Sequence, residues 1–464
     1  MLHRQVAQAL ERLCSDQLDP VSGQLAVHYE QAGLTQQAFT YYRRAATVAH
    51  LLFAYPEMVT YLKKSLTLLE SLPATAEYLG EKLDVLSLLG NILIIVKGFT
   101  APEVEEVLSR ARELCYAVDN LEQRFAVLRG LYIYWQQRCR LKIAAKLNQE
   151  MLDLAQKAQN PLHLQVVLRS TGALAFHQGK LPEALAYFKQ TIALYRPDQH
   201  DSPTNYRQDE GLANLHRILG TLWLLGYPDQ AQIKMKEMVA LAHQVARPFD
   251  LLITLDFALD LERCLRRPLA MRLLVADVTA LVAKHPYPYY VAVDNIYRGW
   301  LLAEQGEIGE GIVLLQQGLD ALRKMEQLLF MPLWLSWLVE VYEHAKQFAP
   351  GLTLVVETLA VVAETGDEFW SAELHRLKGE LLLGQGGATH EVEACFQEAI
   401  AIARRQAAKS LELRAAISLA RLWQQQGRGV EARRQLAEIY GWFTEGFATA
   451  DMQEARLLLD QLPL

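Results

Sequence analysis

Residues 166–197 read VVLRSTGALAFHQGKLPEALAYFKQTIALYRP, and this stretch decides the fold. Gly172 and Ala184 lie where two antiparallel helices would cross, and only small side chains leave room at a close crossing. Gly179 allows a tight connection after the first helix. Pro182 falls in the first turn of the second helix, where its missing N–H has no cost. One such helix pair cannot bury its own apolar faces, so the stretch predicts an array of stacked pairs.

The same spacing of small and aromatic residues recurs along the chain. Residues 166–197 and Val21–Ala49 resemble the tetratricopeptide repeat (TPR), a helix–turn–helix unit of about 34 residues. Elsewhere, proline and glycine punctuation and apolar periodicity predict further helices. We therefore predict an all-α fold, a right-handed TPR-like solenoid of about ten or eleven helix pairs. The amphipathic segment Asp451–Leu462 is predicted to cap its end.

The most polar stretch of the chain is Pro197–Gly211, with the sequence PDQHDSPTNYRQDEG. This composition predicts a loop between repeats and a possible hinge. We therefore expect three parts. They are an N-terminal array in residues 1–196, the polar loop in residues 197–211, and a C-terminal array with its capping helix in residues 212–464.

Composition indicates a folded protein without an obvious polyanionic partner. The chain has 464 residues, 51% hydrophobic and 21% charged, a length too great for one compact core but ordinary for a solenoid. Its formal charge of −7, from 46 basic and 53 acidic residues, gives no whole-chain sign of nucleic-acid or acidic-membrane binding. Five cysteines without a CxxC pair indicate reduced thiols in the cytosol.

No targeting or spanning segment stands out in the sequence. The start MLHRQVAQALERL is charged and amphipathic, unlike a signal peptide. The longest apolar run, Leu328–Val339, is shorter than the roughly 20 residues needed to cross a bilayer. We therefore expect a soluble cytoplasmic protein with no membrane partner and no nucleic-acid partner.

Searches for catalytic motifs find no GxxxxGK[ST], HExxH or GxSxG and no Cys/His cluster with metal spacing. Asp256 and Asp260 share one helix face, and we interpret them as a solvated or partner-facing pair rather than a general acid and base. His177 and His344 each stand singly within a helix, which is typical of satisfied or exposed histidines. We expect no enzymatic activity, no catalytic residue, no metal site and no cofactor.

The functional signal is the concave groove that the first helix of each pair would line. With the crossing glycines as register marks, three arginines and several aromatic and apolar residues should face it. The candidates are Tyr134, Trp135, Arg169, Phe176, His177, Arg217, Leu224 and Arg376. Arginines with interleaved aromatics suit carboxylates or an acidic, partly apolar peptide, because a guanidinium offers bidentate hydrogen bonds and stacking. Ion pairs between adjacent repeats would explain the arginines equally well, and both interpretations stay open.

A basic stretch, Arg404–Arg434, holds eight Lys or Arg residues against two Glu. These charges are distributed around the helices and no nucleic-acid-reading motif accompanies them. We therefore interpret the stretch as a solvated face.

Five stretches resemble a particular family. They are HRQVAQALE with LAVHYEQAG near the N-terminus, RGWLLAEQGEIGEGIVLLQQGL, AELHRLKGELLL, EACFQEAIAIARRQAAKSLELRAAISLARLWQQQGR and YGWFTEGFATADMQEARLLLDQL. They are similar to the C-terminal TPR region of large bacterial signalling proteins. In that family an adenylate cyclase or kinase domain precedes a STAND-type ATPase, and the repeats follow.

The resemblance implies a non-catalytic scaffold or sensor that binds a protein or peptide partner and regulates a signalling ATPase, cyclase or kinase. Two alternatives remain. The chain could be a fragment of a larger ATPase or adenylate cyclase enzyme whose catalytic domains lie upstream. It could also be the effector domain of a STAND-type transcriptional regulator.

Overall fold

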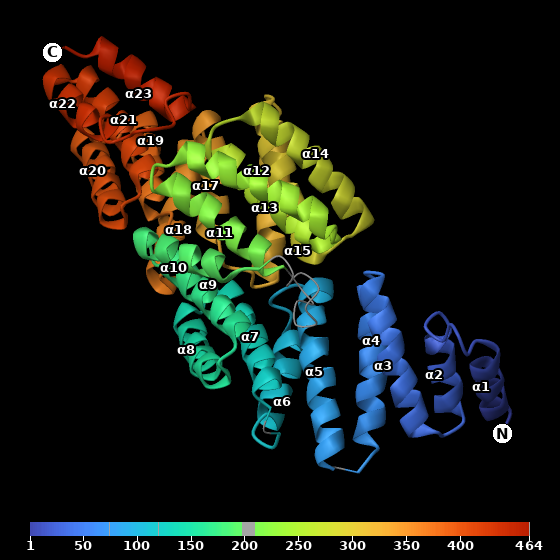
Figure 1. Ribbon diagram of the computed structural model, residues 1–464. Coiled ribbons are helices and arrows are strands. Elements are labelled where there is room, and N and C mark those ends of the chain that lie inside the picture. The colour runs from blue at the N-terminus through green and yellow to red at the C-terminus, as the bar shows by residue number, and fades with distance from the viewer. Residues whose placement is uncertain (74, 119, 197–208, 464) are drawn as a thin grey trace. The chain divides into compact units, whose positions relative to one another are not determined.

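The structure, a computed structural model, describes residues 1–73, 75–118, 120–196 and 209–463. This part of the chain forms 23 helices and no strand, which confirms the all-α class (Figure 1). The predicted hinge falls largely on residues 197–208, which lie outside the described residues. Its last two residues, Glu210 and Gly211, already belong to a helix. Within the described part, two compact units separate: residues 1–137 with 146–163, and residues 138–145 with 164–196 and 209–463.

The first unit is a row of helices in which, from α1 to α7, each packs on the next one along the chain. Its helices are α1 (Leu2–Leu13), α2 (Ser22–Gln31), α3 (Thr35–Leu51), α4 (Tyr55–Glu70), α5 (Ala76–Lys97), α6 (Pro102–Leu114), α7 (Leu121–Gln137) and most of α8 (Leu141–Ala158). The repeat predicted at Val21–Ala49 is the pair α2 and α3. Its core joins Leu25, Tyr29 and Ala38 to Ala7 of α1.

The second unit holds the remaining helices. They are most of α9 (Pro161–His177), then α10 (Leu181–Leu194), α11 (Glu210–Leu224), α12 (Pro228–Val245), α13 (Pro248–Cys264), α14 (Pro268–Lys284), α15 (Pro288–Glu304), α16 (Ile308–Lys324), α17 (Met331–His344), α18 (Phe348–Thr365), α19 (Ser371–Gly384), α20 (Thr389–Gln406), α21 (Lys409–Gln425), α22 (Gly429–Tyr440) and α23 (Ala450–Gln461). From α11 to α22 each first helix contacts its own partner. Contacts between successive first helices join α11 to α13, α15 to α17, α17 to α19 and α19 to α21, which is the packing of a TPR-like solenoid.

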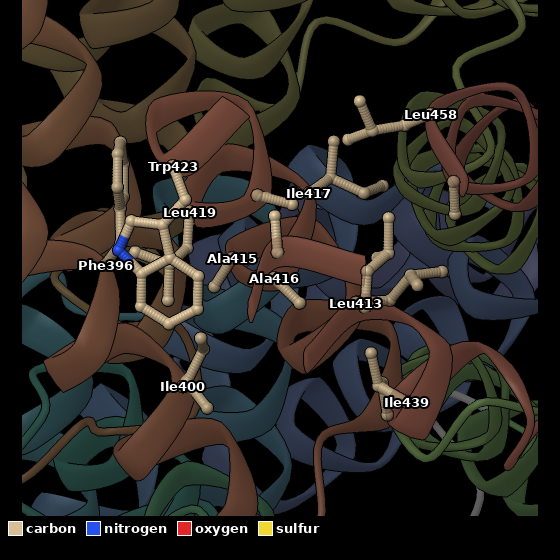
Figure 2. Packing of buried hydrophobic residues seen from close by; sticks show 14 of the residues in the cluster. Phe396, Ile400, Leu413, Ala415, Ala416, Ile417, Leu419, Trp423, Ile439 and Leu458 are labelled. Carbon is tan, nitrogen blue, oxygen red and sulfur yellow. The ribbon is translucent and has the colours of Figure 1, made fainter. Parts of the chain in front are cut away.

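Small residues set the helix crossings, as the sequence predicts. A Cβ atom added at Gly172 would lie 2.6 Å from Cε1 of Phe188, and one at Gly311 would lie 2.6 Å from the carbonyl oxygen of Gly299. The glycines at positions 299 and 311 thus let the backbones of α15 and α16 touch. At the C-terminal end, Phe396, Leu413 and Leu458 belong to one apolar cluster that joins α20 to α23 (Figure 2).

Replacing Gly299 by Ala is expected to lower the free energy of unfolding by about 1–3 kcal/mol. The added Cβ would lie 2.6 Å from the Leu315 nitrogen and 2.8 Å from the Gly311 oxygen, and these are backbone atoms that cannot turn aside. Urea unfolding followed by circular dichroism measures the change. Gly309→Ala is the matched control, because nothing lies within 4 Å of its added Cβ. Equal losses in both variants would contradict this account of the crossing.

The inner layer of the second unit is a packed core rather than an open groove. Eleven residues of α17 are buried, among them Trp334 and Trp337. Contacts also close across long stretches of sequence. The Ser410 hydroxyl donates to the Trp223 carbonyl at 2.5 Å, and the Glu368 N–H donates to the His177 carbonyl at 2.7 Å. The array in this unit therefore turns back on itself, so that α11 contacts α21.

One helix in the described part, α18, is long and apolar enough to cross a membrane by length and composition alone. Its mean hydropathy is 1.4, and 22% of it is buried. Gly351, Val355, Thr358 and Val362 form its buried face. The helix packs against α17 and α19 as a member of the array.

Candidate functional site

The second unit contains a cavity of about 430 Å³, which we call the charged cavity. It lies where the first helices α13, α15, α17, α19 and α21 converge with α23. Its charged lining consists of Arg263, Arg266, Arg376, Arg414 and Arg421 together with Glu304, Glu340, Glu343, Glu373, Glu380, Asp451 and Glu454. The same charges that line the cavity also join helices far apart in the sequence.

Glu373 of α19 forms the deepest part of the ion-pair network, with 1% of its side chain exposed. Arg376, one turn later, donates to both carboxylate oxygens, through Nη2 at 2.8 Å and Nε at 3.0 Å. Arg414 of α21 places its Nη1 atom 3.7 Å from the same carboxylate. Burial by itself would raise the pKa of Glu373, but Arg376 and Arg414 outweigh it and lower that pKa to about 2. Glu373 therefore stays ionised between two buried cations.

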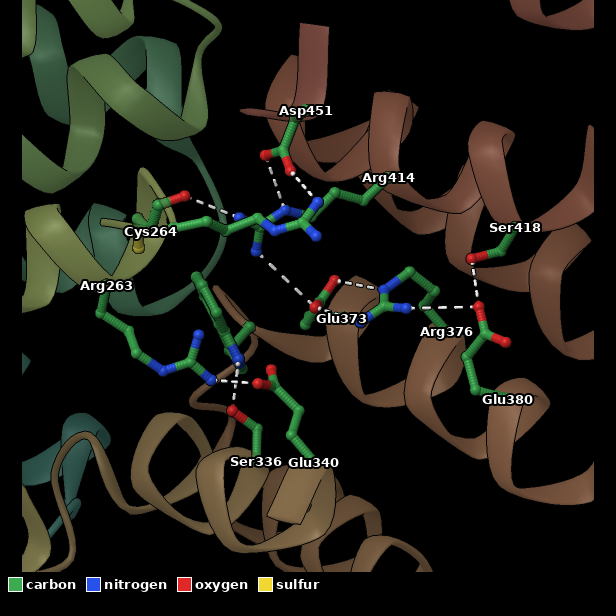
Figure 3. A network of polar contacts seen from close by, with 12 residues as sticks. Arg263, Cys264, Ser336, Glu340, Glu373, Arg376, Glu380, Arg414, Ser418 and Asp451 are labelled. Atoms are coloured by element: carbon green, nitrogen blue, oxygen red, sulfur yellow. Dashed lines mark hydrogen bonds and ion pairs between the residues drawn. The ribbon is translucent and has the colours of Figure 1, made fainter. Parts of the chain in front are cut away.

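Arg414 ties three helices together. Its Nε atom donates to the Asp451 carboxylate of α23 at 2.9 Å, and its Nη2 atom donates to the carbonyl of Cys264, the last residue of α13, at 2.7 Å. Its guanidinium carbon also lies 4.9 Å from the ring centroid of Trp223. Figure 3 shows Arg414 between Cys264, Asp451 and Glu373. The contact holds the end of α13 near α23 although 150 residues separate Cys264 from Arg414.

Charge is distributed unevenly over the cavity wall. Arg263 pairs with Glu340, and its guanidinium carbon lies 5.0 Å from the ring centroids of Trp300 and of Trp337. Glu343, beside Glu340 on α17, has no ion pair or hydrogen bond within the described residues. Five arginines face seven carboxylates, so the carboxylates exceed the arginines by two. The α17 side of the cavity is therefore the acidic side.

A second, smaller cavity of about 50 Å³ is apolar. Phe176, Arg217 and Leu224, three of the groove candidates, line it together. The guanidinium carbon of Arg217 lies 5.6 Å from the Phe257 ring centroid and 5.2 Å from that of Phe330. The aromatic surface here is thus already covered by a cation of the chain itself, and little space is left for a ligand.

His177, which follows Phe176 in α9, is fully buried together with Asp367. Its Nδ1 atom is 2.8 Å from the Asp367 carboxylate, and the Cys139 thiol lies against the same carboxylate. Burial, followed by the charge of Asp367, raises the pKa of Cys139, so the thiol stays protonated. Because the carboxylate stands between the thiol and the imidazole, these residues do not form a nucleophile and its base. They are a buried connection between the α7–α8 turn, α9 and the α18–α19 turn.

The remaining candidates also lie in packed surroundings. Arg169 is 7% exposed, and its Nε atom donates to the Glu210 carboxylate of α11 at 2.9 Å. Tyr134, in the first unit, is fully buried and donates to Glu105 at 2.9 Å, and Trp135 packs edge-on to it. The expectation that these residues face an open groove is not met, because ion pairs and ring packing fill the inner layer. Among the eight candidates, Arg376 lines the charged cavity.

Two further expectations are corrected. Asp256 is buried and Asp260 is half-buried, because α13 belongs to the inner layer and is covered on most sides. Tyr297 donates to Asp256, and burial raises the Asp256 pKa to about 7. In the basic stretch, four of the eight basic residues are exposed, which agrees with a solvated face: Arg404, Arg405, Arg421 and Arg434. The Arg414 side chain, however, is only 10% exposed and pairs with Asp451, and Arg428 pairs with Glu393 at 3.1 Å as well as with Glu431. Asp451 and Glu393 lie outside the stretch, so its own composition could not reveal these two pairs.

The sequence contained one local signal for this site. Glu373, Arg376 and Glu380 are spaced three and four residues apart in AELHRLKGELLL, a spacing that pairs charges on one helix face. Glu340 and Glu343, by contrast, follow an apolar run and carry no signal that would connect them to Arg263. Within the described part of the chain, no group of three or more His, Cys, Asp or Glu residues is arranged to hold a metal ion.

The helix pairs and this inner layer define a TPR-like helical-repeat protein with a charged cavity. No family model matches the chain. A curated relative, Uncharacterized protein R02095 of Rhizobium meliloti (strain 1021), is 25% identical over 416 residues. The match covers 86% of this chain and spans 39% of the relative's length.

Solved structures with similar helical arrays include two bacterial proteins and a human one. The apo quorum sensor NprR from B. thuringiensis is 12% identical, with 78% of this chain and 98% of that one covered and a TM-score of 0.46. The Rap conjugation gene regulator of the plasmid pLS20, in complex with the Phr* peptide, is 13% identical. The match covers 69% of this chain and 78% of that one, with a TM-score of 0.42. The human IFIT1 dimer with m7Gppp-AAAA is 13% identical. The match covers 86% of this chain and 89% of that one, with a TM-score of 0.43. Likeness at this level carries no argument about function.

Proposed function

We propose that the protein is a non-catalytic scaffold or sensor that binds a protein or peptide partner through the charged cavity. The observation that carries this proposal is the convergence of six helices on one cavity of about 430 Å³. Cavities of roughly 300–1,000 Å³ suit small ligands or a few side chains of a peptide. The residues around it, from Arg263 to Glu454, come from both ends of the stretch α13–α23.

Binding at this position would act on the geometry of the unit. Arg266, just beyond α13, pairs with Asp451 at 3.3 Å and with Glu454, and Arg414 pairs with Asp451 at 2.9 Å. A ligand that bridges these charges favours the arrangement in which α13 and α23 stay close. A ligand that competes for them favours a more open one. A ligand shifts such an equilibrium only through its different affinity for the two arrangements.

We propose further that the unit regulates a bacterial signalling ATPase, cyclase or kinase in the cytoplasm. The support is the resemblance of five sequence stretches to the repeat region of such proteins, together with the five free cysteines. The curated relative is longer than this chain, which covers 39% of it. In such an assembly the repeats would supply recognition, and the chemistry would belong to another domain.

Affinity capture from a lysate of the source cells, with proteins identified by mass spectrometry, tests the proposed function. We expect a partner that wild type retains and Arg421→Trp loses, because Arg421 lines the cavity with 53% of its side chain exposed and a bulky indole there would take up part of the cavity. Arg323→Trp is the matched control, since Arg323 is 45% exposed and, among the described residues, pairs with Asp320 of its own helix. The captured partner, once purified, should bind the Arg421 variant about tenfold more weakly in calorimetry. Equal binding by all three proteins would contradict recognition at the cavity.

A further inference from the structure

We infer that the charged cavity takes a cationic group, the lysine or arginine side chain of a basic peptide segment, on its α17 side. This inference rests on the proposed function and adds the chemical class of the ligand. It reverses the expectation from the sequence, in which the arginines indicated an acidic partner. The reversal follows from what the arginines already bind.

The buried arginines have no free hydrogen-bonding edge for an anion. Arg376 directs Nε and Nη2 to Glu373 and places Nη1 3.4 Å from Glu380. Arg414 is engaged by Asp451, by the Cys264 carbonyl and by Glu373. An acidic ligand would have to displace carboxylates that are themselves buried, and this would leave them as uncompensated charges.

The carboxylates, in contrast, are in excess and one of them forms no direct ion pair. Glu343 is half-buried and has no ion pair or hydrogen bond within the described residues. Burial comes first among the causes that raise its pKa, and the negative charges of Glu380 and Glu340 act in the same direction, while Arg376 and His344 oppose them. An ammonium or guanidinium group beside Glu343 would supply the missing positive charge.

The surroundings of Glu343 also suit a long cationic side chain. Glu304 adds a third carboxylate to this side, with His344 at 4.0 Å from it and 64% exposed. The exposed position of His344 shows that solvent reaches this side. A volume of about 430 Å³ accepts one or two such side chains, not a folded domain.

Isothermal titration calorimetry with capped tetralysine tests the inference, with capped tetraglutamate and spermidine as comparison probes. We expect saturable binding of tetralysine by wild type and binding about tenfold weaker, or more, by Glu343→Gln. Glu357→Gln is the matched control, because it removes the same charge from an exposed position on α18 and should leave the affinity unchanged. Circular dichroism establishes that both variants are folded.

The other outcomes separate the ligand class from the proposed function. If Glu343→Gln and Glu357→Gln weaken tetralysine binding equally, the attraction is a general one to an acidic protein. That result would contradict a cation site at Glu343. Tighter binding of tetraglutamate would overturn the cationic class. Tighter binding of spermidine than of tetralysine would support the class but overturn a peptide as its source. If no cation binds while partner capture still depends on Arg421, the ligand class fails and the scaffold function stands.

Discussion

Replacing Glu373 by Ala is expected to lower the free energy of unfolding by about 3–5 kcal/mol, the usual cost of removing one partner from a buried ion pair. The substitution leaves Arg376 and Arg414 close together, both with little exposed side chain, and without the carboxylate between them. Urea unfolding followed by circular dichroism and tryptophan fluorescence measures the loss. Glu357→Ala, at an exposed position on the neighbouring α18, is expected to change stability by less than about 0.5 kcal/mol.

The pH dependence of the same variant provides an independent test. The pKa of Glu373 is about 2 in the folded protein, against 4.5 for the free side chain. A carboxyl group whose folded pKa is depressed contributes stability above its unfolded pKa, and that contribution is lost as the pH falls from about 4.5 toward 2. Wild type should therefore lose stability more steeply than Glu373→Ala over this range. Parallel curves for the two proteins would mean that Glu373 is not held by its arginines as the structure shows.

The repeats could be predicted from the sequence because their signals are local. Gly172 and Ala184 mark a crossing within one helix pair, and the prolines that open α13 and α14 mark helix starts within one turn. Every residue needed for such a prediction lies within about 34 positions. The all-α class and the repeat character follow from these short-range constraints.

The site could not be predicted in the same way because it depends on how the array turns back on itself. Arg414 meets Cys264 and Asp451, and Arg263 meets Glu340, across separations of 37 to 150 residues. Each helix pair is rotated slightly relative to the next, and these rotations add up over many pairs. The total rotation cannot be read from the residues of any single repeat. The register rule therefore selected residues of the first helices, but it could not tell a groove from a packed core.

His177→Ala is expected to lower the free energy of unfolding by about 3–5 kcal/mol, through a cavity in the core and a buried carboxylate that loses its donor. The ring is fully buried, with its centroid 4.9 Å from that of Phe330 and 5.6 Å from that of Phe369, and its Nδ1 atom binds Asp367 at 2.8 Å. Urea unfolding measures the loss. His390→Ala, at an exposed position in the first turn of α20, is the matched control and should change stability by less than about 0.5 kcal/mol.

The protonation of His177 separates this contact from a simple loss of packing. Burial, opposed by Asp367, lowers the pKa of His177 in the folded protein below its ordinary value of 6.5. The unfolded chain then binds the proton more readily than the folded one, so stability falls as the pH drops below about 6.5. Wild type and His390→Ala should share this slope, and His177→Ala should show a shallower one, because His163 and His216, whose pKa values burial also lowers, still contribute. If His177→Ala instead lost stability more steeply than wild type between pH 7 and pH 5, the imidazole would be protonated beside Asp367, and the connection would be an ion pair rather than a neutral hydrogen bond.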